Sequence, residues 1–226
     1  ALAQYAAPGC LTNTFYNSAE EQLTRVLQLC EQVEPEFIAR TALFARQRGR
    51  MKDLPALLCA VLSMRSPGLL AEVFERIHDD ARMLRNFVQI MRSGAVGRKS
   101  LGTLPKRLIL HWLESRTDEA LFRASVGNDP SLDDVIKMVH PKPNSASRAA
   151  LYAYLIGRDH DASQLPARVR QYESFKKNMS PMIPDVPFQM LTHLPLNTGH
   201  WMEIARHAPW QMTRMNLNTF ARHGVF

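Results

Sequence analysis

Apolar residues recur every three or four positions along this chain, which is the period of an α-helix that buries one face. The segment 18–33 begins with Ser18 and Glu21, a capping box, and continues with apolar residues on one side of the predicted helix. The same period fills the segments 35–49, 53–64, 69–91, 105–116, 131–140, 145–157, 165–179, 187–194 and 198–208. The alternating runs that indicate strands joined by hairpin turns are absent from the sequence.

Residues that start and stop helices punctuate these segments. Pro35 stands in a first helical turn and Gly49 follows the last one, while Ser131 and Asp134 form a second capping box before a stop at Pro141. Short helices joined by loops rich in Pro, Gly and Ser predict an all-α fold. Such helices form either a bundle or a solenoid of helix pairs.

Composition restricts the class of protein further. With 226 residues, of which 46% are hydrophobic, the chain can bury the core of one large domain or of two small ones. No run of 18 apolar residues occurs, so we expect no membrane span. The sequence starts without the features of a signal peptide, and Cys10, Cys30 and Cys59 form no CxxC pair. We therefore expect a reduced, cytoplasmic compartment in which the thiols are small core residues.

Motifs for catalysis are missing or fail in their spacing. The segment GAVGRKS resembles a phosphate-binding P-loop, but Arg98 stands where that motif needs a glycine before the lysine. HExxH, a Cys–His cluster and a GxSxG elbow do not occur. We expect a protein that is not an enzyme and that uses no metal and no other cofactor.

Positive charge is concentrated in one segment. Residues 92–113 hold five Lys or Arg and no Asp or Glu, and the net charge of the chain is +7. Arg98 and Lys99 fall in a predicted loop, and Lys106 and Arg107 fall in the first turn of the next predicted helix, where cations are unfavourable. An external anion would remove this conflict. The alternatives are solvated charges or pairing with the acidic N-terminal helix, which carries Glu20, Glu21 and Glu31.

Two further basic segments are candidates for contact with nucleic acid. KMVHPKPNSASR contributes Lys137, His140, Lys142 and Arg148 around two prolines that stiffen the loop, although His140 also suits a helix-terminal cap. ARVRQYESFKK interleaves cations with aromatic residues, a composition that suits single-stranded RNA if the rings are not buried in the core. Its members are Arg168, Arg170, Lys176, Lys177, Tyr172 and Phe175.

Four segments resemble the TROVE domain of bacterial Ro-like RNA-binding proteins, which are relatives of the animal Ro autoantigen. They are GRKSLGTLPKRL, DPSLDDVIKMVHPKP, VPFQMLTHLPL and PWQMTRMNLNTFARHGVF, and the match runs through essentially the whole chain. The resemblance implies a ring-shaped stack of HEAT-like helix pairs with a basic central hole. Such proteins hold the single-stranded 3′ ends of misfolded noncoding RNA in the hole and bind small Y RNAs on their outer basic surface.

The resemblance also assigns residues. His140 and Lys142 match the His and Lys of the family's H-x-K-P motif, which serves Y RNA binding, and Lys137 matches the basic residue before it. Gly127 stands where animal members have a basic residue, which counts against an identical Y RNA footprint. Further matches to basic family positions are Arg98, Lys106, Arg107 and Arg123.

We therefore expect one TROVE domain over residues 1–226 that binds Y-like RNA and misfolded RNA ends in RNA quality control or repair. An exoribonuclease or an RNA-repair enzyme is the expected protein partner. The closing helices and the von Willebrand factor A-like domain of the family are not found before Phe226, so we expect an open arc cut from a longer protein. The alternatives are a HEAT-type scaffold for an acidic protein partner and, with less support, a subunit of an RNA-processing enzyme.

Overall fold

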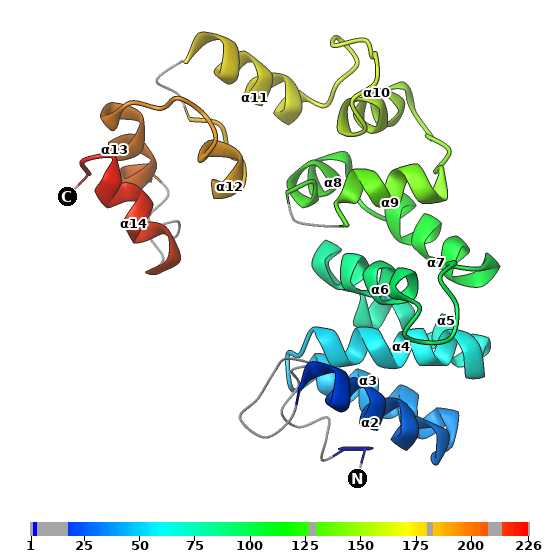
Figure 1. The fold of residues 1–226 in the computed structure, drawn as a ribbon. Coiled ribbons are helices and arrows are strands. Elements are labelled where there is room, and N and C mark those ends of the chain that lie inside the picture. The colour runs from blue at the N-terminus through cyan, green and yellow to red at the C-terminus, as the bar shows by residue number, and fades with distance from the viewer. Residues whose placement is uncertain (1, 4–17, 127–129, 180–182, 208–213, 226) are drawn as a thin grey trace. The chain divides into compact units, whose positions relative to one another are not determined.

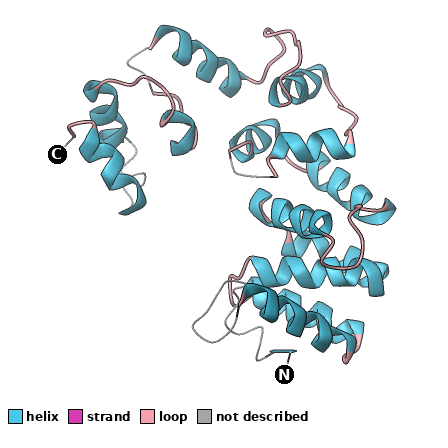
Figure 2. Ribbon diagram, in the orientation of Figure 1, coloured by secondary structure: helices cyan, strands magenta, loops and turns pink. Residues whose placement is uncertain are grey.

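The computed structural model describes residues 2–3, 18–126, 130–179, 183–207 and 214–225 (Figure 1). Over these residues all regular structure is helical and no strand occurs (Figure 2). The prediction of an all-α fold is thereby confirmed. Within the same residues, no helix combines the length and the apolar character needed to cross a membrane.

The chain divides into two compact units. The first comprises Ala1–Arg116 and Gly127–Pro141, and the second comprises Thr117–Val126 and Lys142–Phe226. The first unit contains α2 (Ala19–Glu31), α3 (Pro35–Gln47), α4 (Asp53–Arg65), α5 (Pro67–Ile77), α6 (Ala81–Ser93), α7 (Thr103–Glu114) and α9 (Leu132–Val139). The second contains α8 (Asp118–Ala124), α10 (Ala146–Leu155), α11 (Ala167–Asn178), α12 (Phe188–Leu191), α13 (Thr198–His207) and α14 (Arg214–Arg222).

Helix α4 is the centre of the first unit. Its residues 54–63 are all buried, as expected for a helix that is apolar on every side. Helices α3, α5 and α6 pack against it, and α7 and α9 pack against each other and against α5 and α6 respectively (Figure 1). This packing places the loop between α6 and α7 next to α9.

Capping side chains decide where several helices begin. Both predicted capping boxes are present, at Ser18 before α2 and at Ser131 before α9. The predicted helical run over 69–91 is in fact two helices, because the Asp80 carboxylate accepts a hydrogen bond from the Met83 N–H at 2.8 Å and starts α6. The periodicity missed α8 and α14, which are short.

The second unit has an aromatic core in its C-terminal part. The rings of Phe188, Trp201 and Phe220 lie 5.5 to 5.8 Å apart between centroids. Nearer its start, α8 packs against α10 and α11. The buried Arg148 of α10 forms an ion pair there with Asp118 of α8.

Candidate nucleic-acid interface

Two glycines fix the ends of the basic loop between α6 and α7. Gly94 ends α6 with φ of 82°, and Gly102 precedes α7 with φ of 75°. Residues with a side chain rarely adopt these values, so glycine is required at both ends. Gly102 also supplies no side chain to cap α7, and because Pro105 has no N–H, the donors that remain available to an anion are those of Thr103 and Leu104.

Arg98 anchors the loop from inside. Its Nη2 donates a hydrogen bond to the Leu101 carbonyl at 2.9 Å and lies 3.5 Å from the Ser63 hydroxyl on α4. A Cβ at Gly102 would lie 2.8 Å from Nη1 of the same guanidinium, so this close approach depends on glycine as well. Arg98 was expected to contact RNA, but its charged group is folded into the protein and holds the shape of the loop.

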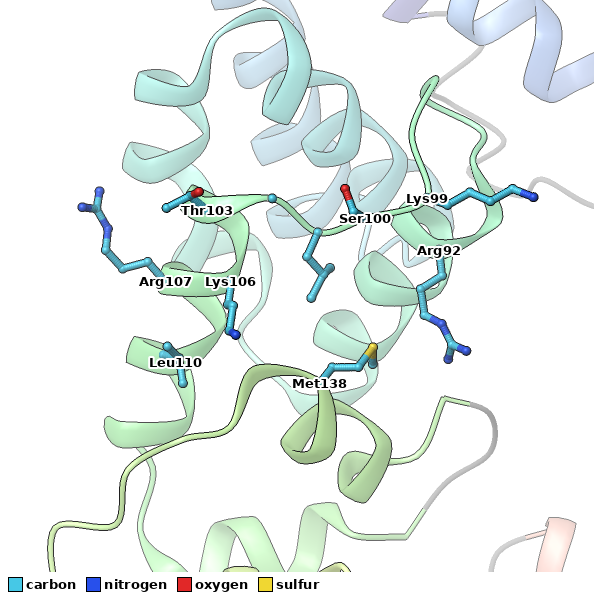
Figure 3. Close-up of a pocket in the computed structure, with 10 residues that line it drawn as sticks. Arg92, Lys99, Ser100, Thr103, Lys106, Arg107, Leu110 and Met138 are labelled. Carbon is cyan, nitrogen blue, oxygen red and sulfur yellow. The ribbon is translucent and has the colours of Figure 1, made fainter.

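A groove of about 690 Å³ opens in front of this loop. We call it the basic groove; it is lined by Arg92, Lys99, Ser100, Leu101, Gly102, Thr103, Lys106, Arg107, Leu110 and Met138. Figure 3 shows Thr103, Lys106, Arg107 and Leu110 along α7, with Arg92, Lys99 and Ser100 opposite and Met138 on α9. The groove therefore combines four cations and two hydroxyls with an apolar lining, and it contains no acid.

The four cations of the basic groove form no ion pair with any residue in the part of the chain that the structure describes. The side chains of these four residues form no ion pair or hydrogen bond there, whereas Arg46 elsewhere in the unit pairs with both Asp79 and Asp80. The expected alternative partners do not reach the groove: Glu21 instead accepts a hydrogen bond from the Ser18 N–H at 2.7 Å. The dipole of α7 adds to the positive potential.

No family model, no curated protein and no solved structure matches this chain. The resemblance to the TROVE domain therefore stays a prediction. What can be said of function rests on the geometry of the residues themselves.

His140 ends α9 in the left-handed conformation, with φ of 51°. Its backbone N–H donates to the Ile136 carbonyl at 2.9 Å, while its side chain is exposed. Lys137, one turn earlier, is exposed and pairs with Asp133 at 2.8 Å. Lys142 is also exposed but belongs to the second unit.

The remaining predicted contacts are engaged in ion pairs within the second unit. Arg148 is buried against Asp118, and Arg123 pairs with Asp185. In the third basic segment, Arg168 pairs with Asp185 as well, and the Lys176 ammonium lies 5.0 Å from the centre of the Tyr172 ring. Tyr172 and Phe175 are buried, so these rings do not offer a stacking surface.

Arg92 and Met138 are among the lining residues that had not been selected from the sequence. Arg92 lies at the end of α6, and the acid-free stretch that begins with it was a usable signal. Met138 reaches the groove only because α9 packs beside α6 and α7, which no local pattern indicates.

The described residues contain no group of three or more His, Cys, Asp or Glu placed to hold a metal ion. Burial raises the pKa of the Cys30 thiol to about 11 and that of Cys59 further, which disfavours the reactive thiolate at both.

Proposed function

We propose that this protein binds noncoding RNA and that the basic groove fixes RNA phosphates without catalysis. The observation that carries the proposal is that four cations, which form no ion pair with the described residues, surround one groove without an acid at the start of a helix. Phosphate is the anion that such an arrangement suits best, because Lys and Arg pair with it and free helical N–H groups donate to it.

The other lining residues fit a nucleotide rather than a simple anion. Ser100 and Thr103 offer hydroxyls at the rim, and Leu101, Leu110 and Met138 offer apolar surface. A ribose or a base can pack on that surface while its phosphate is held by the cations. The contact is then tolerant of sequence, because no pair of side chains is arranged to read a base edge.

The resemblance to the TROVE domain makes the proposal more specific. It supports a HEAT-like stack of helix pairs over residues 1–226, a cytoplasmic role in RNA quality control, and Y-like RNA together with misfolded RNA ends as ligands. An exoribonuclease or an RNA-repair enzyme fits as the protein partner. Among the predicted contacts of the first unit, Lys99, Lys106, Arg107, Lys137 and His140 keep exposed or groove-lining positions and stay candidate RNA contacts. Lys142 is exposed in the second unit and stays a separate candidate there.

The test is the salt dependence of RNA binding by the purified chain. Fluorescence anisotropy would compare wild type with a variant that carries Arg92→Gln, Lys99→Gln, Lys106→Gln and Arg107→Gln. For a single strand each lost phosphate contact flattens the slope of log affinity against log salt by roughly 0.7. We expect a flattening by about two to three for the fourfold change.

A matched control loses the same charge elsewhere. Arg25, Arg82, Arg158 and Lys177 are exposed and lie outside the groove. Their joint replacement by glutamine should change affinity and slope much less. Equal behaviour of the two variants would refute the proposal, and tight binding of an acidic protein in place of RNA would favour the scaffold alternative. Shortened RNA after incubation would indicate an enzyme.

A further inference from the structure

Helix α3 exposes two phenylalanines. Phe37 keeps 44% and Phe44 keeps 66% of its surface accessible to solvent. The other phenylalanines among the described residues are buried: Phe74, Phe87, Phe122, Phe175, Phe188 and Phe220. Exposed single apolar residues are common, but two exposed phenylalanines on one helix call for an explanation when the other described phenylalanines are buried.

Both rings lie on the same face of α3. Seven residues make almost two turns, so Phe37 and Phe44 project in nearly the same direction, about 10.5 Å apart along the axis. The opposite face is the core face, where Ile38, Ala42 and Ala45 are buried. Because α4 and α5 occupy that side, the two rings point out of the first unit.

Arginines alternate with the rings. Arg40 follows Phe37 by three positions and Arg48 follows Phe44 by four, so all four share the outward face. Both arginines are exposed, and neither forms an ion pair with any residue that the structure describes. We call Phe37, Arg40, Phe44 and Arg48 the aromatic–arginine stripe. The acid of this helix, Glu36, lies about a quarter of a turn from Phe37 and is the i,i+4 neighbour of Arg40, with which it forms no ion pair in the described residues.

We propose that the aromatic–arginine stripe is a second RNA contact of the first unit, on which unpaired bases stack. This inference rests on the proposed function, since it assumes that the chain binds RNA. Phenylalanine rings stack on any base, and each neighbouring arginine can pair with the phosphate that follows. A duplex keeps its bases stacked on each other and gains nothing from the rings, so the stripe selects single strands.

Charge complementarity favours RNA over a protein partner. The buried centre of a protein interface is mostly apolar, although Phe and Arg are both enriched there. Here each ring stands beside an arginine, and no apolar residue joins Phe37 to Phe44 on the outward face. The stripe therefore has the alternation of rings and cations found where proteins bind single strands.

The test distinguishes base stacking on an aromatic ring from contact with any apolar side chain. The double variant Phe37→Leu, Phe44→Leu keeps apolar side chains but removes the rings, and Phe37→Tyr, Phe44→Tyr keeps the rings. Anisotropy would measure binding of single-stranded oligouridine and of a fully paired RNA duplex. We expect the leucine variant to lose about tenfold in oligouridine affinity for each ring, with duplex affinity and melting temperature unchanged. The tyrosine variant should bind like wild type.

A matched control changes an exposed apolar residue of the second unit, Met202→Ala, which should leave both affinities unchanged. If the leucine variant binds oligouridine like wild type while the fourfold groove variant loses affinity, the stripe is refuted and the proposed function stands. If wild type binds neither RNA, both proposals fail. Equal losses for strand and duplex, or a change of oligomeric state in the leucine variant, would also refute base stacking.

Discussion

Replacing Arg148 by methionine tests whether Arg148 stabilises the fold or contacts RNA, which is the role that the sequence had indicated. The Arg148 side chain is 7% exposed and pairs with Asp118, which is 23% exposed. Its Nη1 lies 3.3 Å from the Tyr152 hydroxyl. The change removes the buried charge and its bonds while the methionine retains most of the aliphatic volume.

The expected loss of stability depends on the interactions that Asp118 retains in the variant. Breaking a buried ion pair by removing one partner costs about 3–5 kcal/mol, because the other charge is left buried. Asp118 still accepts a hydrogen bond from the Ser147 hydroxyl at 2.8 Å and is partly open to water. We therefore expect the lower end, a loss of about 3 kcal/mol in the free energy of unfolding.

Urea unfolding followed by far-UV circular dichroism would measure this loss. The exposed Lys142→Gln is the matched control, and its unfolding free energy should equal that of wild type. RNA affinity of the folded Arg148→Met protein should be unchanged. A variant of normal stability that binds RNA weakly would contradict this reasoning and return Arg148 to the interface.

Three other residues give separate predictions. Arg98→Lys and Arg98→Gln should weaken RNA binding by a similar factor of about five, because a lysine keeps the charge but not the loop hydrogen bond. If the lysine variant alone bound RNA like wild type, Arg98 would be a phosphate contact instead. Burial lowers the pKa of His78 from 6.5 to about 4, so the unfolded chain takes up the proton first and stability falls as pH falls from 6.5 towards 4. The unfolding free energy should fall by about 3 kcal/mol over this pH range. Urea unfolding at several pH values should show that the His78→Leu variant lacks this pH dependence. His140→Ser should lower affinity for a Y-like stem by about 1–3 kcal/mol and leave the melting temperature and oligouridine binding unchanged, whereas equal losses for both RNAs would contradict a duplex contact.

Local patterns were sufficient for most of the helices. Capping boxes depend on residues three apart, so Ser18 and Ser131 predicted the starts of α2 and α9 from the sequence alone. The break at Asp80 was harder, because the apolar period continues through it and only the cap interrupts the helix.

The candidate site was predictable in charge but not in arrangement. The absence of acids from 92–113 marked the segment, yet a sequence cannot show that Arg98 turns inward while Lys99 stays exposed. The roles of Arg123 and Arg148 depend on Asp185 and Asp118, which lie 62 and 30 residues away along the chain. Pairing over such separations is set by tertiary packing.

Lysine reactivity tests most directly whether RNA occupies the basic groove. The purified chain would be acetylated briefly with and without saturating RNA, and modification at each lysine would be measured by mass spectrometry. Lys99 and Lys106 line the groove, and the exposed Lys177 lies outside it. We expect bound RNA to slow acetylation of Lys99 and Lys106 and to leave Lys177 unchanged. Unaltered reactivity of Lys99 and Lys106 in a sample whose RNA is bound would contradict the basic groove as the RNA site.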